Sequence, residues 1–174
     1  MRYLFLVLTV IVNLIFTGVV FPRLSILGIA PDLIICTMAS IVALEKSRVG
    51  AAIGFICGLA LDIMYAGVIG FYTLPYFVVG MSLYFAVSRI NYIDPVLVPE
   101  LLAAGAFFAK ELLAALLAYM LGRDVSLGYR LMRFVLPETL ATALLMLLVH
   151  LLFKRLYRSN SIRPKGMEDL KKLL

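Results

Sequence analysis

The stretch from Val49 to Val87 reads VGAAIGFICGLALDIMYAGVIGFYTLPYFVVGMSLYFAV and contains a single charged residue, Asp62. Its 39 residues are about twice the ~20 that a helix needs to cross the hydrocarbon core of a bilayer. The turn between the two halves is predicted among Asp62, Gly67 and Gly70, where the charge and the glycines gather. This stretch therefore predicts two consecutive transmembrane helices.

The composition of the whole chain agrees with a membrane location. Of its 174 residues, 64% are apolar and 15% are charged, whereas a soluble domain has about half and about a quarter. A water-soluble core of this size has no room for so much hydrocarbon. This excludes a cytoplasmic enzyme, a secreted disulfide scaffold and a disordered protein. Cys36 and Cys57 both lie in apolar runs and predict neither a disulfide nor a metal site.

Four more apolar stretches bring the predicted fold to an all-α integral membrane protein with six transmembrane helices. They are Tyr3–Val20, Leu24–Leu44, Val96–Leu121 and Phe134–Phe153. The second is interrupted by Pro31 and Asp32. A helix that begins at Pro31 has 14 residues before the polar turn at 45–48 and spans only about 21 Å. A continuous helix kinked at Pro31 is the competing interpretation, and five crossings remain an alternative to six.

The distribution of Lys and Arg predicts the orientation in the membrane. With six crossings, eleven basic residues fall on the side of both termini and four on the opposite side, and basic residues concentrate on the cytoplasmic side. We therefore expect a polytopic domain over 1–153 and a basic cytoplasmic tail over 154–174. The tail carries seven basic and two acidic residues, which predicts contact with anionic lipid. No basic face elsewhere favours nucleic-acid binding.

Three glycines and an aspartate recur at intervals of four residues: Gly50, Gly54, Gly58 and Asp62. In a helix this spacing places them on one face. Small residues on such a face let two backbones approach closely in a membrane. The stripe predicts close helix packing, either inside the protein's own bundle or against a helix of another protein.

Asp62 lies near the outward end of its predicted helix, where an ionised carboxylate needs hydrogen-bond donors. The candidates are backbone amides that open the next helix near Gly67 and Gly70, or one of the arginines in the loop after 121. We favour a structural role over ligand binding or catalysis. Asp32 is expected on the same side of the membrane, but the sequence around the two aspartates lacks the signatures of an intramembrane aspartyl protease.

Further polar contacts inside the membrane are predicted for Glu100, Lys110 and Glu111 on the fifth helix and for Glu138 on the sixth. Adjacent helical positions point about 100° apart, so Lys110 and Glu111 are not expected to face each other. Each is expected to find a partner elsewhere, such as Glu138 or His150. The sequence predicts no metal ion and no cofactor, since His150 has no other ligand type at a suitable spacing.

The order of these residues resembles a known family. Pro31-Asp32-Leu33, the run from Arg48 to Asp62 and Gly67-Val68-Ile69-Gly70-Phe71-Tyr72 are similar to the rod shape-determining protein MreD. The close similarity covers about residues 31–80. Outside it, the length, the topology, the Pro137-Glu138 pair and the basic tail agree.

The resemblance implies a non-catalytic scaffold of the bacterial cell-elongation complex in the inner membrane. It implies binding to the transmembrane helix of MreC, an indirect link to MreB, and association with RodA and its class B penicillin-binding transpeptidase. It also implies a fold similar to the substrate-binding subunits of energy-coupling-factor transporters, so a vitamin-binding subunit is the alternative function. The motif positions implied in helix packing or partner binding are Pro31, Asp32, Gly50, Gly54, Gly58, Asp62 and Gly70.

Overall fold

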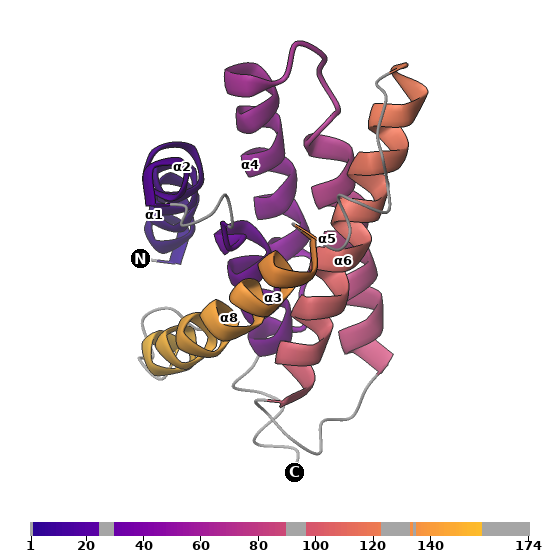
Figure 1. The fold of residues 1–174 in the computed structure, drawn as a ribbon. Coiled ribbons are helices and arrows are strands. Elements are labelled where there is room, and N and C mark those ends of the chain that lie inside the picture. The colour runs from indigo at the N-terminus through magenta and orange to yellow at the C-terminus, as the bar shows by residue number, and fades with distance from the viewer. Residues whose placement is uncertain (1, 25–29, 90–96, 123–132, 134, 158–174) are drawn as a thin grey trace.

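The computed structural model describes residues 2–24, 30–89, 97–122, 133 and 135–157, and within these residues it contains helices and no strand (Figure 1). In these described residues six helical segments follow one another, which confirms the predicted all-α architecture. They are α1 (Arg2–Ile15), continued by η1 (Phe16–Val20) and α2 (Phe21–Leu24), then α3 (Leu33–Glu45), α4 (Val49–Tyr65), α5 (Thr73–Arg89), α6 (Leu97–Met120) and α8 (Leu136–Tyr157).

Three helical stretches of the described chain are long and apolar enough to cross a membrane by themselves. They are Arg2–Arg23, Pro99–Met120 and Leu136–Tyr157, each of 22 residues. At 1.5 Å per residue each spans about 33 Å, which matches the ~30 Å hydrocarbon core. α3 and α4 are apolar but shorter, with 13 and 17 residues.

α3 lies at the centre of the bundle. Every side chain from Leu33 to Val42 is buried, so this helix has protein around its whole circumference and no lipid-facing side. Figure 1 shows α3 enclosed by the other helices, with α8 crossing in front of it and α1 at the edge of the bundle. The exposed large apolar side chains lie on the helices around α3, as expected where lipid is the solvent.

The two ends of α3 explain its length. Asp32 precedes the helix, and its side chain accepts a hydrogen bond from the Ile35 amide at 3.2 Å, as an N-cap does. At the other end Lys46 adopts the left-handed conformation with φ 48°, which stops the helix. The helix is therefore short and starts after Pro31; it does not run through that proline.

The stripe of glycines on α4 faces the neighbouring helices of the same chain. A Cβ atom added at Gly58 would lie 2.7 Å from the Cα of Thr73 on α5. At Gly54 it would lie 2.5 Å from the sulfur of Met38 on α3, and at Gly50 2.7 Å from the carbonyl oxygen of Met38. α4 thus approaches α3 and α5 more closely than any residue with a side chain would allow.

Two sequence predictions fall outside the described residues. The basic tail lies largely in 158–174, and most of the loop arginines lie in 123–132. The orientation in the membrane and the boundary of the tail therefore stay predictions.

Candidate functional site

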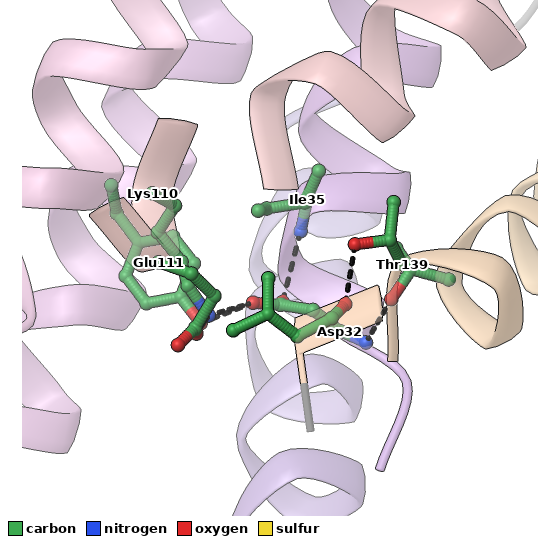
Figure 2. Close-up of polar contacts among 8 residues, drawn as sticks. Asp32, Ile35, Lys110, Glu111 and Thr139 are labelled. Carbon is green, nitrogen blue, oxygen red and sulfur yellow. Dashed lines mark hydrogen bonds and ion pairs between the residues drawn. The ribbon is translucent and has the colours of Figure 1, made fainter. Parts of the chain in front are cut away.

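Asp32 is the point at which four helices of the bundle are joined. Its Oδ2 accepts hydrogen bonds from the Tyr76 hydroxyl at 2.7 Å and from the Lys110 ammonium at 3.0 Å. Its backbone N–H donates to the Thr142 hydroxyl at 3.1 Å. Figure 2 shows Lys110 reaching Asp32, whose other carboxylate oxygen meets the Ile35 amide. The start of α3 is therefore tied to α5, α6 and α8.

The ammonium of Lys110 is shared between two carboxylates. Besides Asp32, it lies 2.7 Å from Oε1 of Glu111, the next residue along α6. The expectation that these neighbours do not meet was wrong. The 100° separation applies to the Cβ directions, and the flexible lysine side chain bends back far enough to reach its neighbour. The same ammonium lies 4.7 Å from the ring centre of Phe107 and 5.5 Å from that of Tyr76.

Asp62 closes the turn between α4 and α5. Its carboxylate accepts hydrogen bonds from the backbone N–H groups of Gly70 at 2.8 Å, Tyr72 at 2.7 Å and Thr73 at 3.0 Å, and from the Thr73 hydroxyl. These donors lie at the start of α5. The sequence had offered two kinds of donor for Asp62, backbone amides that open the next helix or loop arginines, and the structure has the first kind. A negative charge there also complements the positive end of the helix dipole. Gly70 adopts φ 108°, a conformation that glycine allows.

A cavity of about 340 Å³ opens beside Asp32. Its walls come from η1, α2, the segment before α3, and helices α4, α5, α6 and α8. The lining residues are Thr17, Phe21, Pro22, Ala30, Pro31, Asp32, Leu61, Tyr65, Tyr72, Tyr76, Phe107, Lys110, Glu111 and Glu138. It thus combines charged groups with aromatic side chains, the mixture typical of small-molecule sites.

A second buried polar cluster surrounds Glu45 at the opposite end of α3. The Glu45 carboxylate lies 2.8 Å from the Arg2 guanidinium and accepts hydrogen bonds from the hydroxyls of Ser47 at 2.9 Å and Tyr157 at 2.6 Å. It therefore joins α1, α3 and the end of α8. From the sequence, Glu45 was expected only as part of the polar turn at 45–48, and its burial was not predicted. A carboxylate directly after a long apolar run was the available signal.

The remaining predicted residues lie apart from these clusters or at their edges. Glu100 lies in the first turn of α6. Glu138 lies in the first turn of α8 and lines the cavity together with Pro31. Gly50, Gly54 and Gly58 face α3 and α5, as described above. A role of any of these residues in binding another protein stays a prediction.

Among the described residues, no group of three or more His, Cys, Asp or Glu side chains is placed to hold a metal ion. In the described residues, buried ion pairs and a capped helix end join the helices of the bundle. The family model of the rod shape-determining protein MreD matches residues 1–160.

This chain belongs to the MreD family. The match extends well beyond the motif region at 31–80 that carried the resemblance. MreD proteins are shape-determining membrane proteins, so this chain acts in determining rod shape at a membrane. No curated protein and no solved structure matches the chain. The similarity to energy-coupling-factor subunits therefore stays a prediction.

Proposed function

We propose that this MreD protein is a non-catalytic scaffold of the cell-elongation complex in the bacterial inner membrane. It binds the transmembrane helix of MreC, which connects it to MreB, and it holds RodA and its class B penicillin-binding transpeptidase nearby. Both termini face the cytoplasm, where the basic tail contacts anionic lipid. The observation that carries the proposal is the family match over residues 1–160.

The chemistry of the bundle supports a scaffold. Asp32, Asp62 and Glu45 each bind groups on helices other than their own or cap a helix start. Buried charges used in this way fix the arrangement of helices. A rigid bundle presents a constant surface to other membrane helices. The vitamin-binding alternative has no support from the comparisons, and the scaffold is the function we propose.

The groove between α5 and α6 is the surface best suited to a partner's helix. It is lined by Val78, Val79, Ser82, Leu83, Ala86, Leu101, Leu102, Gly105, Ala106, Ala109 and Leu113. Ser82 and Ala86 on α5, and Gly105 and Ala109 on α6, are pairs of small residues four positions apart. Unlike the glycines of α4, Gly105 has no atom within 4 Å of the position that a Cβ would take. Another helix can therefore approach α6 closely at Gly105.

The test is co-purification of MreC, RodA and the transpeptidase with the tagged full-length chain from native membranes. Gly105→Leu places a side chain in the groove at a position where a Cβ meets no other atom within 4 Å, and we expect it to lower the recovery of MreC by about tenfold, equivalent to ~1.4 kcal/mol. Gly67→Leu is the matched control, because Gly67 lies in the α4–α5 turn with nothing within 4 Å.

Two outcomes separate the parts of the proposal. If the wild-type chain recovers none of the three proteins, the scaffold function is wrong. If the wild type recovers them and Gly105→Leu recovers them equally well, the scaffold stands and the groove is not the binding surface.

A further inference from the structure

The hairpin of α4 and α5 is short for a structure that crosses the membrane twice. Arg48 precedes α4 and Arg89 ends α5, and both are exposed. The Arg48 guanidinium lies 5.4 Å from the ring centre of Tyr84, near the end of α5, so the two arginines mark the same end of the hairpin. Each helix has 17 residues and spans about 25 Å. With the arginines at one face of the ~30 Å hydrocarbon core, both helices end ~5 Å before the other face.

The turn at the far end of this hairpin has an apolar surface (Figure 1). Residues 63–72 read IMYAGVIGFY and contain no charged residue, whereas turns that reach water are rich in Asp, Asn and Ser. The exposed large aliphatic side chains here, which we call the apolar tip, are Ile63, Met64, Val68, Ile69 and Leu74. Ile63 and Ile69 have 73% and 75% of their surface exposed. Contact of this surface with water is unfavourable.

The backbone of the turn is hydrogen-bonded in the way that a lipid environment requires. Non-helical backbone at membrane depth needs partners inside the protein, because hydrocarbon offers none. The Asp62 carboxylate accepts hydrogen bonds from the N–H groups of Gly70, Tyr72 and Thr73, and the Asp62 carbonyl accepts one from Ala66. Asp62 itself is only 1% exposed. It therefore takes the place of the water that solvates the amides of an ordinary surface turn.

The hydroxyl of Tyr65, beside the apolar tip, is also satisfied within the chain. Its side chain is exposed, yet the hydroxyl donates to the carbonyl oxygen of Gly18 on η1 at 2.8 Å. Tyrosines at the membrane surface usually direct this group to water or headgroups. A hydroxyl held by a backbone carbonyl needs neither, which agrees with a position below the headgroups.

The distribution of the apolar tip favours lipid over a partner protein. Ile63 and Met64 are neighbours on α4 and point about 100° apart, Val68 and Ile69 lie in the turn, and Leu74 lies on α5. All five are exposed. A partner's helix covers one side of a hairpin, whereas acyl chains surround it on every side that the bundle leaves open.

We propose that the α4–α5 turn lies inside the bilayer, below the headgroups, with the apolar tip in contact with acyl chains. Asp62 is the internal acceptor that allows the non-helical backbone to stay at this depth. The hairpin enters the opposite leaflet and turns back without presenting a loop to the water beyond it. This inference does not rest on the scaffold function, and its test uses the chain without any partner protein.

Tryptophan fluorescence tests the depth of the turn directly, because the native chain contains no Trp. Ile69→Trp places the only fluorophore in the apolar tip, and Arg48→Trp places it at the opposite end of the same hairpin as the matched control. Leu148→Trp, on a side chain of α8 that is 67% exposed, is the lipid-facing reference. Each full-length variant is reconstituted alone in nanodiscs, where iodide reaches both membrane faces. Quenching by iodide is compared with quenching by lipids that carry bromine on their acyl chains.

We expect iodide to quench Ile69→Trp several-fold less than Arg48→Trp, and brominated lipid to quench it as it quenches Leu148→Trp. In nanodiscs of short-chain lipid, iodide quenching of Ile69→Trp is expected to rise, because the edge of the hydrocarbon moves towards the turn. The proposal is overturned if iodide quenches the Ile69 and Arg48 variants alike, which places the tip in water. It is also overturned if neither quencher reaches the tip, which places it against protein, or if bilayer thickness has no effect.

A charge at the same position gives a second readout, since tryptophan itself favours the membrane interface. Ile69→Asp is compared with Ile69→Leu by thermal unfolding in nanodiscs. Aspartate is well tolerated in a turn that reaches water, but a carboxylate below the headgroups is costly. We expect Ile69→Asp to unfold several degrees below Ile69→Leu, and equal unfolding temperatures contradict the proposed depth. Val68→Trp replaces Ile69→Trp if that variant fails to fold, with the same outcomes.

Discussion

Lys110 Nζ lies 3.0 Å from Asp32 Oδ2, and this pair joins the middle of α6 to the N-cap of α3 across 78 residues of sequence. Both side chains are largely buried, with 13% and 6% of their surface exposed. A charge buried to this degree is stable only beside its partner. The pair therefore couples the position of α6 to the start of the central helix.

Breaking this pair from one side is expected to be costly. Lys110→Met leaves the Asp32 carboxylate buried without its cation, and Asp32→Asn leaves the ammonium with Glu111 alone. Each single variant is expected to lose about 3 kcal/mol of the free energy of unfolding. The double variant is expected to lose clearly less than the sum of the two. Chemical unfolding in mild detergent measures all four proteins of this cycle. If the double variant loses as much free energy of unfolding as the two single variants together, Lys110 and Asp32 are not coupled.

Asp62 is expected to stabilise the α4–α5 turn through its charge as well as its shape. Asp62→Asn keeps one acceptor oxygen and loses the charge that faces four donors, so we expect a loss of ~1–3 kcal/mol. Asp62→Ala leaves all of these donors without their acceptor and is expected to cost more. Hydrogen exchange of the amides of residues 70–73 is the direct readout. If these amides are equally protected in the wild type, Asp62→Asn and Asp62→Ala, then the Asp62 carboxylate does not cap the start of α5.

The glycines of α4 and of the turn are expected to respond differently to the smallest side chain. Gly58→Ala places a Cβ 2.7 Å from the Cα of Thr73, which is backbone and cannot rotate away. We expect α4 and α5 to separate at a cost of about 1–3 kcal/mol. Gly67→Ala meets nothing within 4 Å and is expected to change stability by less than ~0.5 kcal/mol. Similar unfolding midpoints for the two variants would show that the helices do not pack this closely.

Tyr157 is expected to hold the end of α8 against α3. Tyr157→Phe removes the hydroxyl that donates to the buried Glu45 carboxylate at 2.6 Å, and a hydrogen bond to a charged group contributes ~1.5–3 kcal/mol. Tyr3→Phe is the control, because Tyr3 is 83% exposed and is expected to have no measurable effect. Thermal unfolding compares the two. An equal response would mean that the Glu45 cluster does not stabilise the bundle.

Much of the helix arrangement was predictable because the membrane imposes it. The apolar run at 49–87 predicted two helices with a turn among Asp62, Gly67 and Gly70, and the structure has α4 and α5 with their turn at 66–72, so Asp62 itself lies in α4. A short helix beginning at Pro31 was one of two predicted alternatives, and the observed helix begins two residues later, at Leu33, with Asp32 as its N-cap. Proline and aspartate at that point favour a helix start for local reasons, which is why the sequence contains the signal.

The pairing of charged residues was not predictable, because it depends on which helices become neighbours. Nothing in the sequence near Lys110 indicates that its partner is Asp32. A helix without a polar face, such as α3, also gives no indication of which helix packs against which of its sides. Glu45 was missed for a related reason. A carboxylate at the end of a helix is usually solvated, and the distant partners of Glu45 are Arg2 and Tyr157, the first and last residues of the described helices.

The burial of α3 has a consequence for how the molecule is made. With 13 residues this helix spans about 20 Å and is too short to stay across the lipid as a single inserted segment. Its N-cap needs Lys110 and Thr142, and its far end needs Tyr157. These partners lie 78 to 112 residues further along the chain, so α3 is synthesised well before the residues that hold it in place.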